Sequence, residues 1–192
     1  MVRLKYRIDG FTMIEVLVTI VVILLGLLGL AQLHVRIQQS ELEAYQRAQA
    51  LTLLSDMVSR INANRQTAPC YAITGTTGTP YLGAAGSDHL GAPACMGYGS
   101  ASTQALAISD LAAWDGFLNG TSETQSGAAV GAMIGARGCV TFDAPSNTYT
   151  VAIAWQGIAD LPAPTVSCAN NLYGPETKRR VVWTTLTIGT LL

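Results

Sequence analysis

Hydrophobic residues follow three different patterns along this chain, and each pattern predicts a different element. The first pattern is a run from Phe11 to Leu33 in which residues 16–31 carry no charge and Thr19 is the only polar side chain. A helix needs about twenty mainly apolar residues to cross the hydrocarbon core of a bilayer. We therefore predict a membrane-spanning helix over 11–33.

The second pattern begins after this run, where hydrophobic residues recur every three or four positions. That spacing is typical of a helix with one buried face. Glu43 and Arg47 stand four residues apart, so an ion pair along the helix surface is expected. Asn62 and Asn64 end the pattern, which gives one long helix over 11–65. The predicted buried stripe consists of Ile37, Ala44, Ala48, Leu51, Leu54, Val58 and Ile61.

The rest of the chain, residues 66–192, is predicted to form a globular head. Its first part, 66–137, is rich in Gly, Thr, Ala and Ser. One short helix is expected there, with Ser109 as its N-cap and an end at Asn119. The face expected to be buried carries Leu111, Trp114 and Leu118.

The third pattern begins at residue 138, where hydrophobic residues alternate with polar or small ones. This period of two indicates β-strands. We expect three antiparallel strands, over 139–142, 148–155 and 180–188, with one apolar face. The amphipathic part of the long helix has the matching stripe to cover that face. The predicted fold class is α+β.

Composition argues against several classes of function. Only 12% of residues are charged and the formal net charge is −1, so there is no general electrostatic case for nucleic acid binding. His34 and His89 are isolated and are expected at the surface or in an interface. No Ser-His-Asp, Cys-His or metal-ligand arrangement and no phosphate-binding loop is apparent, so we expect neither an enzyme nor a cofactor.

Two further groups of residues have alternative interpretations. Lys178, Arg179 and Arg180 form a basic run that would suit nucleic acid or phospholipid, but a solvated strand edge is the favoured interpretation. The three tryptophans are expected either in the core or in contacts between subunits. They are Trp114, Trp155 and Trp183.

All four cysteines lie after the apolar run. They are Cys70, Cys95, Cys139 and Cys168, and no pair has the spacing of a zinc site. An even number in an exported domain suggests two disulfides, for which three connectivities are open. We favour the pairs that are local in sequence, which join the first cysteine to the second and the third to the fourth.

The N-terminus carries a short basic leader, with Arg3, Lys5 and Arg7 before the apolar run. The positive-inside rule then keeps the N-terminus cytoplasmic and places everything after Leu33 on the other side of the membrane. A secretory signal would show an A-x-A-like cleavage site after the run. None is evident, so the apolar segment is expected to stay with the protein.

Glu15 is the residue that most needs an explanation. A carboxylate in a membrane-spanning helix costs roughly 2.5–3.5 kcal/mol at mid-depth and less near the edge, and such residues are usually functional. A compensating positive charge is therefore expected. The alternative is a local role, because Thr12-x-x-Glu15 before an apolar run is also the pattern of a helix capping box.

The stretch Gly10-Phe11-Thr12-Met13-Ile14-Glu15-Val16-Leu17, together with the basic leader and the retained apolar helix, resembles the N-terminal signal of type IV prepilins. Within that family, the Gly-Leu-Leu-Gly-Leu-Ala tract that follows and residues 60–65 at the helix end resemble the minor pilins of the pilus-modification, PilV-like type. The resemblance implies a type IV pilin-like fold, with a leader of 1–10.

The same resemblance implies how the chain is processed and where it acts. A prepilin peptidase would cut between Gly10 and Phe11 and then methylate the new amine of Phe11. In a filament, the ammonium of Phe11 would pair with Glu15 of a neighbouring subunit. The implied partners are this peptidase, other minor and major pilins, the inner-membrane assembly platform and a tip adhesin.

The implied location is the inner membrane, with the head in the periplasm, and later the pilus at the cell surface. There the chain would belong to a priming or tip complex that promotes assembly, adhesion and twitching motility. Two alternatives stay open. One is a pseudopilin of type II secretion, which shares the N-terminal motif. The other is a single-pass membrane receptor with a ligand-binding head.

Overall fold

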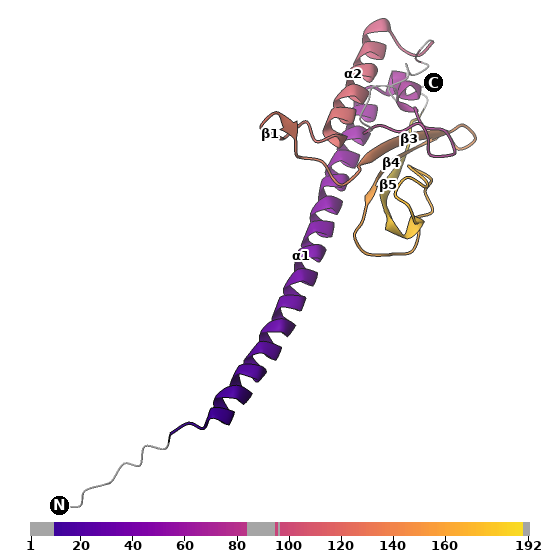
Figure 1. Ribbon diagram of the computed structural model, residues 1–192. Helices are drawn as coiled ribbons and strands as arrows, with labels where there is room; N and C mark the ends of the chain where they lie inside the picture. The colour runs from indigo at the N-terminus through magenta and orange to yellow at the C-terminus, as the bar shows by residue number, and fades with distance from the viewer. Residues whose placement is uncertain (1–9, 84–94, 96, 190–192) are drawn as a thin grey trace, which may run out of the picture. The chain divides into compact units, whose positions relative to one another are not determined.

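The computed structural model describes residues 10–83, 95 and 97–189, and the leader residues Arg3, Lys5 and Arg7 as well as His89 lie outside them. The chain divides into two compact units, Met1–Leu42 and Glu43–Leu192. The helix α1 (Met13–Ala63) supplies residues to both. The other elements in chain order are the 3₁₀ helix η1 (Arg65–Tyr71), α2 (Ala101–Leu118), β1 (Thr124–Gln125), β2 (Ala128–Ala129), β3 (Arg137–Asp143), β4 (Thr148–Gln156), the 3₁₀ helix η3 (Glu176–Lys178) and β5 (Arg179–Thr187) (Figure 1).

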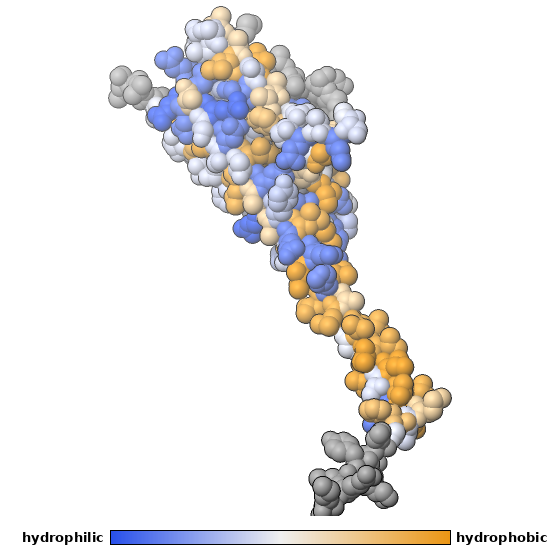
Figure 2. Space-filling model, turned by 90° about the vertical axis from the view of Figure 1, so that its left-hand side faces the viewer, coloured by the Kyte–Doolittle hydropathy of each residue, from blue (hydrophilic) through white to orange (hydrophobic). Residues whose placement is uncertain are grey.

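The described part of the first unit is dominated by the apolar start of α1. Between Val16 and Leu33 its large side chains are exposed on every face, from Val16 at 46% to Leu28 at 67%. Figure 2 shows hydrophobic residues along the visible face of this segment. The helix is long and apolar enough to cross a membrane. A helix that is apolar all round requires a bilayer or other helices around it. The predicted helix itself is confirmed and begins at Met13, and that it spans a membrane stays a prediction.

In the second unit, α1 buries a stripe that is only partly the predicted one. The buried positions are Gln46, Ala50, Leu54, Met57 and Ile61. Leu54 and Ile61 were expected there, whereas Ala44, Ala48 and Leu51 are exposed, so that part of the prediction is wrong. Small alanines occur on both faces of this helix and the polar Gln46 occupies a core position. Hydrophobicity alone therefore does not show which side of the helix faces the head.

The helix α2 is longer than the sequence indicated. It begins after Ser100, whose hydroxyl accepts from the backbone N–H of Thr103 while the Thr103 hydroxyl accepts from the Ser100 N–H. This capping box replaces the expected N-cap at Ser109, which lies inside the helix. The end at Leu118 and the burial of Leu111, Trp114 and Leu118 are confirmed.

The three predicted strands are present and pair in the order β3-β4-β5, all antiparallel. One face of the sheet carries Val140, Tyr149, Val151, Ile153, Trp155 and Val182, which belong to the same hydrophobic core as the buried stripes of α1 and α2. This α+β arrangement, with a long N-terminal helix packed on a small antiparallel sheet, fits the pilin fold. Trp183 points the other way and is 53% exposed, so it is not a core residue.

The opposite face of the sheet is also covered, which corrects the expectation of a single apolar face. A second cluster brings Cys139 and Ala152 of the sheet against Cys168, Ala169 and Tyr173. The last three belong to the segment between β4 and β5, which the hydrophobic period did not identify as part of a core. The middle strand β4 is therefore buried on both sides over residues 151–155.

Candidate functional site

The N-terminal motif lies at the start of α1 and faces outward. Gly10 and Phe11 are exposed and precede the first helical residue, Met13. A Cβ built on Gly10 would meet no atom within 4 Å. No contact with another described residue therefore requires glycine at position 10, and the missing side chain leaves the backbone there open to close approach by a partner.

Thr12 caps the helix. Its hydroxyl accepts from the backbone N–H of Glu15 at 3.3 Å, and its carbonyl accepts from the same N–H at 3.1 Å. This is one half of the capping box considered from the sequence. The other half would use the side chain of Glu15, yet among the described residues the Glu15 carboxylate has neither a hydrogen bond nor an ion pair. The capping box therefore does not explain why position 15 carries a charge.

Phe11 and Glu15 lie on one face of the helix. Together with Val16 and Thr19 they line a shallow hollow of about 300 Å³. The Thr19 hydroxyl donates to the Val16 carbonyl at 2.8 Å and so presents no free proton to the hollow. The site thus consists of one carboxylate beside the residue that would become the N-terminus, on an otherwise apolar surface.

Two glycines farther along this segment are equally open. A Cβ on Gly26 or Gly29 would meet nothing within 4 Å. Glycine weakens a helix interior by up to about 1 kcal/mol relative to alanine. No contact with another described residue offsets this loss, whereas small residues do allow close approach of a second helix.

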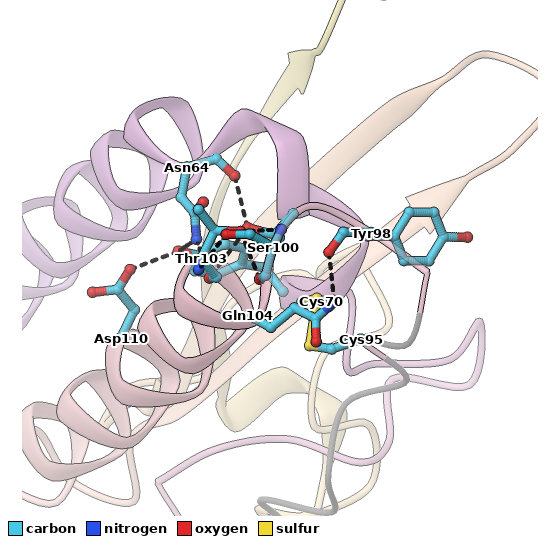
Figure 3. Close-up of a disulfide and its surroundings, with 10 residues drawn as sticks. Asn64, Cys70, Cys95, Tyr98, Ser100, Thr103, Gln104 and Asp110 are labelled. Atoms are coloured by element: carbon cyan, nitrogen blue, oxygen red, sulfur yellow. Dashed lines mark hydrogen bonds between the residues drawn. A yellow bond between two sulfur atoms is a disulfide. The ribbon is translucent and has the colours of Figure 1, made fainter.

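The four cysteines form two disulfides in the head. The pairs are the ones favoured from the sequence, the first cysteine with the second and the third with the fourth. Cys70 joins Cys95 with their Cα atoms 4.8 Å apart, and Cys139 joins Cys168 at 5.8 Å. The first disulfide ties η1 to the segment before α2 (Figure 3). The second ties β3 to the segment between β4 and β5.

The basic run is not a solvated edge. Arg179 is only 2% exposed, donates to the carbonyls of Val166 and Cys168, and pairs with Glu176 at 2.6 Å. Lys178 pairs with Asp160 at 3.0 Å. Both expectations, a free basic patch and a solvated strand edge, are wrong for Arg179, because the covering segment that follows β4 folds around its guanidinium.

Glu43 has a different partner from the expected one. Its carboxylate accepts from the backbone N–H groups of Ile158 and Ala159, both at 3.0 Å, and lies 3.6 Å from Arg180. The Ala159 N–H is the largest cause that holds the pKa of Glu43 below its ordinary value, against the opposing effect of burial. The carboxylate thus attaches the segment after β4 to α1, a contact across more than one hundred residues that no local pattern indicates.

His34 is exposed, as expected of an isolated histidine. Within the part of the chain that the structure describes, no group of His, Cys, Asp and Glu could hold a metal ion.

Comparison with known proteins agrees with the N-terminal geometry. Residues 6–31 match the family model described as the prokaryotic N-terminal methylation motif. No curated protein and no solved structure matches the chain. The matched segment contains Gly10, Phe11, Glu15 and both open glycines.

The matched motif, the apolar helix and the α+β head support a type IV pilin-like protein, either a pilin or a pseudopilin. The motif points to a structural protein and not to an enzyme. It implies processing by a prepilin peptidase and assembly with other pilins. Together with the apolar helix, it fits a membrane-anchored pilin.

Proposed function

We propose that the chain is a minor pilin of the type IV pilus. The precursor crosses the inner membrane once through 11–33, with residues 1–10 in the cytoplasm as a leader and the head of 66–192 in the periplasm. The prepilin peptidase cuts between Gly10 and Phe11 and methylates Phe11. The mature subunit then joins other minor and major pilins through the assembly platform.

The observation that carries this proposal is the carboxylate of Glu15, which has no partner within the described chain and lies beside Phe11 on an apolar helix. Cleavage creates an α-amino group at Phe11 with a pKa near 8, so it is a cation at neutral pH. Methylation leaves that charge in place. The two charges of one subunit then have matching partners in the next subunit.

Pairing between subunits has a clear physical advantage over leaving the charges alone. In an apolar environment, removal of one partner of a buried ion pair costs about 3–5 kcal/mol, because the remaining charge is uncompensated. A subunit at the wrong register would leave the Phe11 ammonium and the Glu15 carboxylate buried without partners. The pair therefore selects the register, while the surrounding apolar surface and the open Gly26 and Gly29 supply close helix packing.

The place we propose is a priming or tip complex that promotes pilus assembly, with roles in adhesion and twitching motility and with a tip adhesin as a partner. Support comes from the resemblance of the Gly-Leu-Leu-Gly-Leu-Ala tract, residues 26–31, and of residues 60–65 to minor pilins. A pseudopilin of type II secretion shares the same motif. Deletion of the gene distinguishes the two, since a minor pilin is needed for surface piliation and a pseudopilin for secretion.

Processing is tested by mass spectrometry of the chain extracted from membranes. We expect an N-terminus at methylated Phe11. An intact Met1 in cells that mature other prepilins would overturn the proposal and favour the membrane receptor.

The ion pair is tested with Glu15→Ala, for which we expect normal cleavage but at least tenfold less subunit in sheared filaments. Tenfold corresponds to about 1.4 kcal/mol, well below the loss expected for a broken buried pair. Glu41→Ala is the matched control, because Glu41 is an exposed glutamate on the same helix outside the apolar run. Equal incorporation of both variants would refute the ion pair.

A further inference from the structure

The head contains a cavity of about 730 Å³ that is separate from the N-terminal motif. It is lined by η1, by the turn between β3 and β4, by the end of β5 and by Tyr98. Its size lies within the range of about 300–1,000 Å³ that is usual for small-molecule sites. All its lining residues lie in the head, outside the apolar segment through which we propose that subunits assemble.

Aromatic rings form one wall of the cavity. Phe142 and Tyr149 are register partners on β3 and β4, with ring centroids 4.6 Å apart and planes inclined by 32°. Tyr149 is almost fully buried, but Phe142 is 39% exposed and Tyr98 is 45% exposed. Figure 3 shows the Tyr98 ring directed away from the Cys70–Cys95 disulfide and from α2. Exposed ring surface in a concave site is available to a ligand.

Polar groups without partners surround these rings. Among the described residues, the Gln66 amide and the hydroxyls of Tyr98 and Tyr149 make no hydrogen bond. Burial raises the pKa of Tyr149, and the nearby Tyr98 raises it further, so the Tyr149 hydroxyl keeps its proton and can donate. The cavity therefore offers an amide and two phenols to hydroxyl groups of a ligand.

Arg65 supplies the charge of the site. Its Nε donates to the carbonyl of Asn62 at 3.1 Å, which fixes the base of the guanidinium. Among the described residues its two Nη atoms have no hydrogen bond or ion pair, and no acidic side chain lines the cavity. A fixed guanidinium with free Nη groups is suited to bind a carboxylate through two parallel hydrogen bonds.

The walls are held in place before any ligand arrives. The Cys70–Cys95 disulfide joins η1 to the segment that carries Tyr98, whose carbonyl accepts from Gln104 at 2.8 Å. On the other side, the amide of Asn147 donates to the carbonyl of Ile188 at 2.9 Å. A preformed site loses less conformational entropy on binding.

We propose that this cavity binds a carbohydrate that carries a carboxylate, such as a uronic acid unit of a polysaccharide. The apolar face of a pyranose ring packs on Tyr98 and Phe142. Its hydroxyls bind the Gln66 amide and the phenols, and its carboxylate binds Arg65. This inference is independent of filament assembly, because binding is a property of the single chain.

The test uses the full chain in phosphatidylcholine nanodiscs, which avoid the sugar headgroups of glycoside detergents. It is titrated with a hyaluronan tetrasaccharide, which contains glucuronate, and with the same tetrasaccharide after its carboxyl groups are reduced to alcohols. Binding is measured by calorimetry and by saturation-transfer NMR, with empty nanodiscs as the blank. We expect about tenfold tighter binding of the acidic form, the usual effect of one charge-assisted pair.

Variants separate the two parts of the site. Arg65→Gln should abolish the difference between the acidic and the reduced tetrasaccharide, while Phe142→Ala and Tyr98→Ala should weaken both about tenfold. The controls are Arg47→Gln and Trp183→Ala, an exposed cation and an exposed ring outside the cavity. Unfolding midpoints equal to wild type show that each variant is folded.

Three outcomes would overturn the proposal. The first is no binding of either tetrasaccharide, and the second is equal loss of binding in the control variants. The third is binding of the peptide Ala-Ala-Ala as tightly as the acidic tetrasaccharide, because the cavity would then recognise a carboxylate without its sugar.

Discussion

Four polar side chains join the end of α1 to η1 and α2 inside the head. Asp110 is 8% exposed and accepts from the Arg60 Nη1 and from the Tyr71 hydroxyl, both at 2.6 Å. Arg60 also pairs with Asp56, one turn earlier, at 2.8 Å. Burial raises the pKa of Tyr71 and Asp110 raises it further, so its hydroxyl stays a donor. Each charge in this group has a hydrogen-bonded partner, as a buried ion pair requires.

Replacement of Asp110 tests this group at the level of one residue. Asp110→Ala leaves the buried Tyr71 hydroxyl without its acceptor and removes one of two acidic partners of Arg60. We expect a loss of about 2 kcal/mol in the free energy of unfolding of the head, because a buried donor loses its acceptor while Arg60 stays partly solvated. Urea unfolding of the full chain, followed by tryptophan fluorescence, measures this free energy of unfolding.

Asp56→Ala is the matched control, since it removes the other carboxylate from the same arginine. Asp56 is 35% exposed, so its loss should cost less than about 1 kcal/mol. Equal effects of the two substitutions would contradict a special role for the buried Asp110.

At the scale of elements, the segment between β4 and β5 is held to its neighbours by acidic residues. Glu43 of α1 binds its beginning, and Glu176 of η3 binds the buried Arg179 near its end. Burial raises the pKa of Glu176, but the hydrogen bonds from Arg179 and from the Asn171 N–H outweigh it, so the pKa is lowered. The pKa of Glu43 is lowered as well. A carboxyl group with a lowered pKa stabilises the fold above its ordinary pKa, and this contribution disappears as the pH falls through the folded-state value.

We therefore predict that acid detaches this segment from α1. Protection of the Ile158 and Ala159 amides from hydrogen exchange should be constant near neutral pH and should decrease below about pH 4.5, the ordinary value for Glu43. Glu43→Gln should lower the protection at neutral pH and remove its dependence on acid. Glu41→Gln, two residues earlier and exposed, should leave both unchanged. Acid-independent protection in the wild type would contradict the prediction.

Local signals explain which elements the sequence could predict. The strands β3, β4 and β5 follow a period of two with turn residues between β3 and β4, so their ranges were predicted within two residues. The start of α2 was missed because its first two turns carry the exposed Leu106 and Ile108 and show no buried stripe. Its capping box also uses Thr103 in place of the usual Glu or Gln.

Contacts between distant residues explain what could not be predicted. The Arg60–Asp110 pair spans fifty residues, and the cavity collects side chains from four separate segments. No period or spacing in the sequence brings these positions together. By contrast, Gly10, Phe11 and Glu15 lie within six residues of one another, so the whole candidate assembly site could be identified from the sequence.

At the scale of the whole molecule, the two units differ in where their apolar side chains lie. The described residues of the first unit, 10–42, expose apolar side chains on every face, and the buried core begins only at Gln46. The stability of the head should therefore not depend on the first unit. The head should, however, depend on the part of α1 that lies inside it. There Glu43 binds the segment after β4, the Gln49 side chain donates to the Gly131 carbonyl, and Ala50 is fully buried.

Two truncations test this division. We expect a fragment of residues 40–192 to be soluble, to form both disulfides and to unfold at the same temperature as the head of the full chain. A fragment of 51–192 lacks Glu43, Gln49 and Ala50, whose two sets of hydrogen bonds contribute about 2–3 kcal/mol in total. For a domain of this size, that loss lowers the unfolding temperature by about 5 °C or more. Differential scanning calorimetry measures the unfolding temperature of each fragment. Equal unfolding temperatures for the two fragments would show that α1 stabilises the head only after Ala50.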